Sequence, residues 1–84
     1  MYEVEWSRPS ERDLRRLDQE TAQRVYAAIR RFADSGYGDV ARIRGAGDEF
    51  RLRVGDIRVR FSFDQNRDAI VIKRVLPRDK AYGD

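Results

Sequence analysis

The chain has 84 residues, a net charge of +3 and neither cysteine nor histidine. Disulfide bonds, thiolate metal sites and catalysis by a histidine base are therefore excluded. Because no apolar run approaches the length of a membrane span and no signal peptide pattern is present, the sequence predicts one soluble, cytoplasmic domain over residues 1–84, with no metal, cofactor or membrane partner.

Positive charge is concentrated in the second half of the chain. Residues 1–40 contain 7 Lys and Arg against 8 Asp and Glu, whereas residues 41–84 contain 11 against 7. Of the 18 basic residues 16 are Arg, whose planar fork of N–H donors suits phosphate better than a lysine does. This bias favours an anionic partner, although a GC-rich coding sequence or adaptation to heat would also enrich arginine.

The chain begins with a predicted strand and a short helix. The segment YEVEWS alternates polar and apolar side chains, as a strand does. Ser7 or Ser10 is suited to cap the helix that follows, in which Leu14 and Leu17 give a narrow apolar face. Asp13 stands three residues after Ser10, the spacing of a capping box.

A second helix is predicted from Asp18, its N-cap, to Gly36, its end. Its apolar residues recur at steps of three and four, which indicates one buried face. The two helices should form an antiparallel hairpin that lies on a sheet.

After the second helix, apolar residues recur at every second position, which is typical of strands. Residues 41–45 are a candidate short strand, 49–54 and 57–63 alternate clearly, and 69–76 are more continuously apolar, which is typical of a central strand. The sequence therefore predicts an α+β fold with an N-terminal strand, a helical hairpin and then three to four mainly antiparallel strands.

Four arginines are expected to share one side of this sheet. The dipeptide Gly55-Asp56 matches a two-residue hairpin turn, and such a turn fixes which residues lie opposite each other. We call the resulting set the arginine face; it consists of Arg51, opposite Arg60, and Arg53, opposite Arg58. Like charges at opposite positions destabilise a sheet, so the set needs nearby acids or a bound anion.

Two interpretations of the arginine face are open. Its guanidinium groups could extend into water and pair with acids such as Glu49, Asp56 or Asp64. Alternatively, the face binds a polyanion through bidentate phosphate contacts, which would make it a nucleic-acid surface with Tyr82 available to stack on a base.

Several segments resemble the RelE/ParE superfamily of toxins from type II toxin–antitoxin modules. They are VEWS and RDLRRL near the start, then FRLRVGDIRVRF, and finally VIKRVLPRDKAY. The resemblance implies a fold similar to small microbial ribonucleases and, for RelE-like members, a ribosome-dependent endonuclease that cuts mRNA and inhibits translation. It also implies a cognate antitoxin that wraps the toxin, with the ribosome and mRNA as the other partners.

The same resemblance implies roles for individual residues. Arg58 and Arg78 match catalytic arginines that hold the phosphate oxygens, and Tyr82 matches the C-terminal catalytic tyrosine. Arg51 and Arg53 fall near a basic pair of the family, and the residues predicted to bind RNA are Arg51, Arg53, Arg60 and Lys80. Pro77 is expected to end the last strand and to direct Arg78 and Tyr82 over the arginine face.

Other activities fit the same residues. Arginine cannot accept a proton at neutral pH, and Asp56, which stands where some members have an acid, is also an ordinary turn residue. A ParE-like inhibitor that binds DNA gyrase, or a catalytically inactive RNA-binding relative, is therefore an alternative to the RelE-like enzyme.

Overall fold

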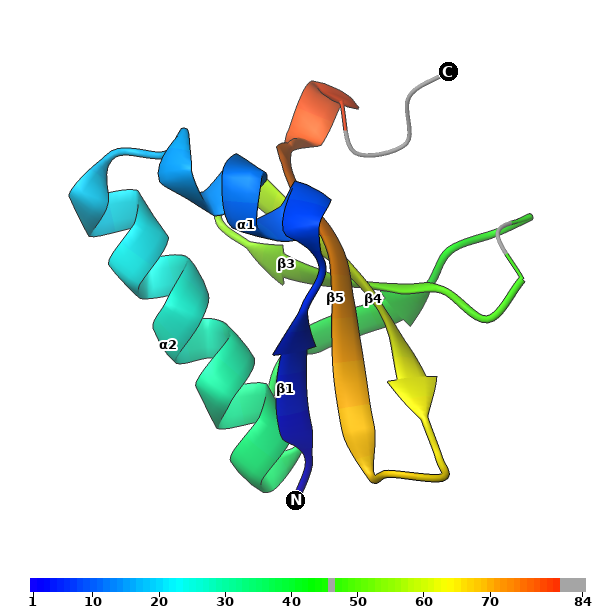
Figure 1. Ribbon diagram of the computed structural model, residues 1–84. Helices are drawn as coiled ribbons and strands as arrows, with labels where there is room; N and C mark the ends of the chain where they lie inside the picture. Colours follow the sequence, from blue (N-terminus) through cyan, green and yellow to red (C-terminus); the bar gives the residue numbers. More distant parts are fainter. Residues whose placement is uncertain (46, 81–84) are drawn as a thin grey trace.

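The computed structural model describes residues 1–45 and 47–80, and this part of the chain forms two α-helices, five β-strands and one 3-10 turn (Figure 1). In chain order these are β1 (Glu3–Trp6), α1 (Arg8–Arg15), α2 (Gln19–Ser35), β2 (Asp39–Arg42), β3 (Phe50–Val54), β4 (Ile57–Asp64), β5 (Ala69–Pro77) and η1 (Arg78–Lys80). This order confirms the predicted α+β fold. None of the described helices has the length and apolar character that a membrane crossing requires.

The strands form one mixed sheet in the order β1-β5-β4-β3-β2. β1 runs parallel to β5, and the other neighbouring strands are antiparallel. β5 lies between β1 and β4, so the strand with the most continuous apolar sequence is inside the sheet, as predicted.

The start of α1 is fixed to the sheet. The Ser7 hydroxyl oxygen accepts a hydrogen bond from the Ser10 N–H at 3.2 Å and donates one to the Lys73 carbonyl at 3.0 Å, so Ser7 is the N-cap. The predicted capping box of Ser10 and Asp13 is wrong. The Asp13 carboxylate instead accepts hydrogen bonds from β5, because tertiary packing brings stronger donors to it than the helix start offers.

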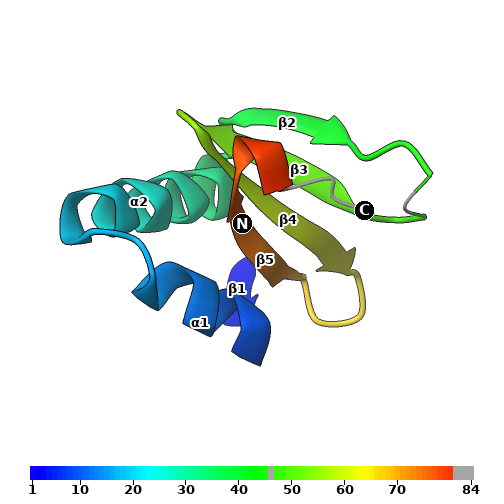
Figure 2. The same ribbon diagram turned by 90° about the horizontal axis from the view of Figure 1, so that it is seen from above.

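The hydrophobic core lies between α2 and one face of the sheet. Asp18 occupies the N-cap position of α2, and Gly36, with φ of 80°, ends it as predicted. Figure 2 shows α2 to one side of the strands. The buried core residues of α2 are Val25, Ile29, Phe32 and Ala33, and those of the sheet are Leu52, Ile57, Val59, Phe61, Ile70, Ile72 and Val75.

A β-bulge in β5 changes which face its side chains occupy. Arg60 of β4 lies opposite Arg74, and the register then shifts by one residue, so that Lys73 is extra on β5. In a regular strand Ile72 and Arg74 would point to the same face. Because of the bulge, Ile72 and Val75 are both buried in the core, at 0% and 1% exposure, and Arg74 points to the opposite face.

Candidate functional site

The β3–β4 hairpin has the predicted two-residue turn. Gly55 has φ of 57°, a left-handed conformation that glycine adopts without strain. The opposed pairs are Arg51 with Arg60 and Arg53 with Arg58, as the turn predicts. The arginine face therefore lies on one side of the sheet, and the alternating core residues of the same strands face α2 on the other side.

Two carboxylates offset part of the repulsion within the arginine face. Glu49 Oε1 accepts hydrogen bonds from Arg60 Nη2 at 2.6 Å and from Arg60 Nε at 3.0 Å. Asp39 Oδ1 accepts one from Arg51 Nη1 at 3.2 Å, and Asp39 Oδ2 lies 3.8 Å from Arg53 Nη1. Glu49 was an expected partner, whereas Asp39 was not, because its strand reaches β3 only through the tertiary fold.

Among the described residues, the other two acids considered for this role form no ion pair with these four arginines. The Asp64 carboxylate binds Arg67 in the β4–β5 turn, and the main-chain carbonyl of Asp56 accepts a hydrogen bond from the Arg78 N–H. Within the described residues, four guanidinium groups thus meet two carboxylates, and the arginine face keeps a net charge of +2.

Arg58 is the most enclosed member of the arginine face, with 8% of its surface exposed. Its Nη1 donates hydrogen bonds to the carbonyls of Gly55 at 2.9 Å and Ile57 at 3.2 Å. These carbonyls belong to the turn and to the first residue of β4. The turn that sets the register therefore also fixes the Arg58 guanidinium. Both of these bonds use Nη1, and Nε and Nη2 take no part in them.

The chain after β5 stays close to this turn. The Arg78 N–H donates to the Asp56 carbonyl at 2.8 Å, which ties the start of η1 to the turn beside Arg58. η1 lies at the same end of the sheet as α1 and the end of β5 (Figure 1). Arg78 and Lys80 are both exposed, and the predicted catalytic residue Tyr82 lies outside the described residues.

Sequence reasoning missed one further ion pair beside the arginine face. Arg74 Nε donates to Asp13 Oδ2 at 2.7 Å and Arg74 Nη2 donates to Asp13 Oδ1 at 3.1 Å, and the Val75 N–H donates to Asp13 Oδ2 at 2.9 Å. β1 pairs with β5 only as far as Ile72, so beyond that residue the Asp13 carboxylate takes a position along the free edge of β5.

These contacts change the acidity of Asp13. Burial by itself raises the pKa of the carboxyl group, whereas the hydrogen bonds from Arg74 and the Val75 N–H and the charge of Arg16 lower it. The net effect is a pKa below the usual value, so Asp13 is ionised at neutral pH.

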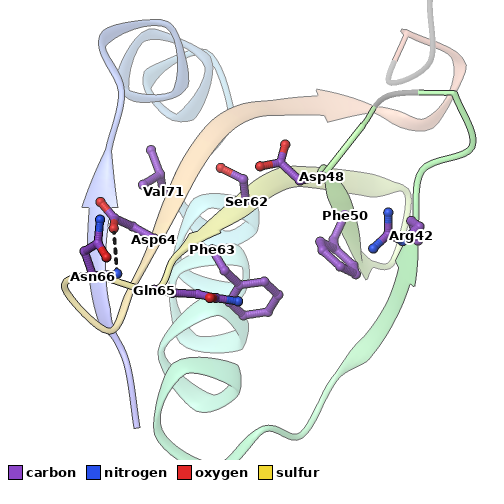
Figure 3. Close-up of a pocket in the computed structure, with 9 residues that line it drawn as sticks. All are labelled: Arg42, Asp48, Phe50, Ser62, Phe63, Asp64, Gln65, Asn66 and Val71. Carbon is purple, nitrogen blue, oxygen red and sulfur yellow. Dashed lines mark hydrogen bonds between the residues drawn. The ribbon is translucent and has the colours of Figure 1, made fainter.

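A separate hollow of about 610 Å³ lies beyond Arg60 along β4 (Figure 3). Ser62 and Val71, which lie opposite each other, form part of its wall; the other lining residues are Arg42, Asp48, Phe50, Phe63, Asp64, Gln65 and Asn66. The hydrogen bond from Arg67 lowers the pKa of Asp64, and the Asn66 N–H also donates to this carboxylate. With two carboxylates and one arginine in its lining, this hollow suits a phosphate less well than the arginine face does.

The chemistry that the arginine face offers is charge stabilisation. Hydrogen bonds fix Arg51, Arg58 and Arg60, and the two carboxylates already accept hydrogen bonds from Arg51 and Arg60. Within residues 1–45 and 47–80, no group of three or more acidic side chains is placed to hold a metal ion. A phosphate bound here would be held by N–H donors and positive charge.

Known protein structures share this fold. The archaeal RelE–RelB complex from Pyrococcus horikoshii has a chain that is 26% identical, with a TM-score of 0.76 over 95% of this chain and 98% of that one. For the RelB–RelE antitoxin–toxin complex from Methanococcus jannaschii the identity is 24% and the TM-score 0.76, over 94% of this chain and 95% of that one. The toxin–antitoxin complex RelBE2 from Mycobacterium tuberculosis is 27% identical, with a TM-score of 0.64 over 92% and 98%.

Sequence comparison identifies the family. No protein with curated annotation matches the chain. Residues 4–82 match the family model described as the ParE toxin of the type II toxin–antitoxin system parDE. The chain is thus a member of the ParE toxin family of type II toxin–antitoxin systems, within the RelE/ParE superfamily.

Proposed function

We propose that this toxin is a ribosome-dependent mRNA endonuclease that acts in the cytoplasm and inhibits translation. The observation that carries the proposal is the arginine face, where two pairs of arginines lie opposite each other with only two carboxylates among the described contacts. A sheet tolerates polar residues of many kinds on such a face. Four cations there favour a ligand with closely spaced negative charges.

The proposed reaction is an attack of a ribose 2′-oxygen on the adjacent phosphorus. A bond forms between these atoms and the bond from phosphorus to the 5′-oxygen breaks, which leaves a 2′,3′-cyclic phosphate and a free 5′-hydroxyl. The 2′-hydroxyl loses its proton and the 5′-oxygen gains one. Negative charge accumulates on the non-bridging oxygens, and N–H donors fixed in advance stabilise it best.

The residues divide this work by position. Arg58, fixed on the turn, and Arg78, at the start of η1 beside the same turn, hold the non-bridging oxygens. Tyr82 orients the base and shares in the proton transfer. The residues that bind the RNA backbone are Arg51, Arg53, Arg60 and Lys80. The ribosome supplies the in-line geometry, which explains how a chain without histidine could work.

A cognate antitoxin is the second partner in this proposal. Several solved relatives are complexes of a toxin with an antitoxin, including those from Pyrococcus horikoshii and Methanococcus jannaschii. An acidic or amphipathic segment of such an antitoxin would match the net positive charge of the arginine face and so keep RNA from it.

The test is primer extension across an mRNA in a cell-free translation reaction. The unchanged protein should cut within codons, and the Arg58→Ala and Arg78→Ala variants should lose this cutting. Arg67→Ala is the matched control, because this arginine is also ion-paired but lies in the β4–β5 turn, away from η1 (Figure 1). Unchanged cutting by both arginine variants would falsify the proposal.

Inhibition of DNA gyrase by binding is the second candidate function. The match to a ParE family model favours it, as does the lack of a free carboxylate in the described part of the arginine face. Inhibition of supercoiling by the purified toxin, together with intact mRNA in the translation reaction, would reverse the order of the two proposals. RNA binding without either activity would indicate an inactive relative.

A further inference from the structure

The β-bulge in β5 extends the arginine face by one strand. Arg51 lies opposite Arg60, and Arg60 lies opposite Arg74, so a row of three arginines crosses β3, β4 and β5. Neighbouring strands are about 4.8 Å apart, and the row therefore spans about 10 Å between its outer backbones. In a regular strand that keeps Lys73, Arg74 would lie on the same face as Ile72, which is the core face.

Arg74 is held in one orientation and remains accessible. Both oxygens of the Asp13 carboxylate accept hydrogen bonds from it, through Nε and Nη2. The Asp13 side chain is only 4% exposed, whereas that of Arg74 is 42% exposed. The carboxylate thus faces the protein, while Nη1, which does not bond to Asp13, is left with two N–H donors for a ligand.

A role in stability alone explains this arrangement poorly. A salt bridge with one buried member often adds little net stability, because removing the charge from water costs about as much as the pairing returns. A two-point bond to a guanidinium does, however, fix the plane of its donors. Recognition of phosphate by arginine depends on that geometry.

We propose that Arg74 is a further phosphate-binding residue, which carries the RNA backbone from the arginine face across β5 toward α1, and that Asp13 positions its guanidinium. This inference rests on the proposed RNA-directed function and deepens it. The phosphate bound by Arg74 would be a neighbour of the one bound by Arg60, because the two residues lie opposite each other.

The experiment measures the affinity of a fluorescent single-stranded RNA oligonucleotide over a series of salt concentrations. Arg74→Gln should weaken binding about tenfold in low salt and reduce the slope of log K against log salt by about 0.7, the value for one lost phosphate contact on a single strand. Arg74→Lys should keep the slope but bind more weakly than the unchanged protein, because lysine cannot make the two-point bond with Asp13.

The control is Arg67→Gln, which removes an equal charge from an exposed ion pair in the β4–β5 turn and should leave the slope unchanged. Thermal unfolding of each variant, recorded in parallel, confirms that binding is compared between folded proteins. Full affinity in Arg74→Lys would overturn the role of Asp13, and an unchanged slope in Arg74→Gln would overturn the role of Arg74.

These outcomes separate the inference from the proposed function. If Arg58→Ala abolishes mRNA cutting while Arg74→Gln alters neither cutting nor the salt slope, the inference fails and the proposed function stands. If the unchanged protein neither binds the oligonucleotide nor cuts mRNA, both fail.

Discussion

Asp13 and Arg74 are 61 residues apart in the sequence, yet Arg74 Nε lies 2.7 Å from Asp13 Oδ2. The bond joins α1 to β5 at the point where β1 no longer pairs with β5. Because the same carboxylate accepts the Val75 N–H, one side chain connects the helix, the strand edge and the row of three arginines.

Asp13→Asn should lower the free energy of unfolding by about 1–3 kcal/mol, because the amide cannot serve all three donors. The loss stays below that for a fully buried ion pair, since Arg74 is 42% exposed and remains solvated. Urea unfolding followed by circular dichroism measures it. Asp34→Asn, which breaks the exposed pair with Arg30, is the control and should cost less than about 1 kcal/mol. Equal losses in both variants would contradict the structure.

The contribution of Asp13 to stability should depend on pH. Its pKa is lower in the folded protein than in the unfolded chain, so its contribution is present above the unfolded value of about 3.9 and is lost as the pH falls through the folded value. The difference in unfolding free energy between the unchanged protein and Asp13→Asn should therefore be constant above about pH 5 and shrink below pH 4. A difference that is equally large at about pH 2 would show that the charge of Asp13 is not responsible.

Arg58→Lys should lose mRNA cutting by about 100-fold or more, although the charge is kept. Lysine offers a compact point charge and cannot bond two turn carbonyls while presenting a planar fork to the phosphate. Primer extension in the translation reaction measures the loss. Arg67→Lys serves as the control, and wild-type cutting by Arg58→Lys would mean that charge alone suffices.

Glu49→Gln should make the arginine face more positive. Arg60 then loses its carboxylate partner Glu49 and lies opposite Arg51 with less compensation. We expect a loss of stability of under about 1 kcal/mol that diminishes as salt is added, together with tighter binding of single-stranded RNA. Unfolding and RNA titrations at two salt concentrations check both effects, and weaker RNA binding would count against the arginine face as the RNA site.

Gly55→Ala should destabilise the hairpin and also disturb Arg58. Alanine at φ of 57° costs about 1–2 kcal/mol, and the Gly55 carbonyl is one of the acceptors that fix the Arg58 guanidinium. Gly45→Ala is a matched control with φ of 77° and no atom within 4 Å of the added Cβ. Both variants should lose stability, but only Gly55→Ala should lose mRNA cutting. Equal mRNA cutting by the two variants would show that the conformation of the Gly55 turn does not position Arg58 for cutting.

The hairpin was predictable from sequence because its determinants are local. A two-residue turn fixes which residues of the two strands lie opposite each other and which side chains share a face. Gly55 and Asp56 are therefore sufficient to place Arg53 opposite Arg58. The order of helices and strands followed from hydrophobic period in the same way.

The partners of the arginines were less predictable because they are set by the tertiary fold. Asp13 matched a local capping pattern, and nothing in the sequence near it indicates a bond with β5. Asp39 reaches Arg51 only because β2 pairs with β3. The bulge at Lys73 gives no signal in a continuously apolar strand, so Arg74 could not be assigned to a face.

The bulge also constrains how the length of this protein can vary. Removing Lys73 would make Ile72 and Arg74 consecutive residues of a regular strand, so Ile72 and Val75 would stay in the core and Arg74 would stay on the opposite face. Removing Ile72 would instead bring the charged Lys73 to the core position opposite Phe61. We therefore expect β5 to tolerate the loss of Lys73 but not that of Ile72, because only the extra residue of the bulge can be removed without changing which side chains face the core.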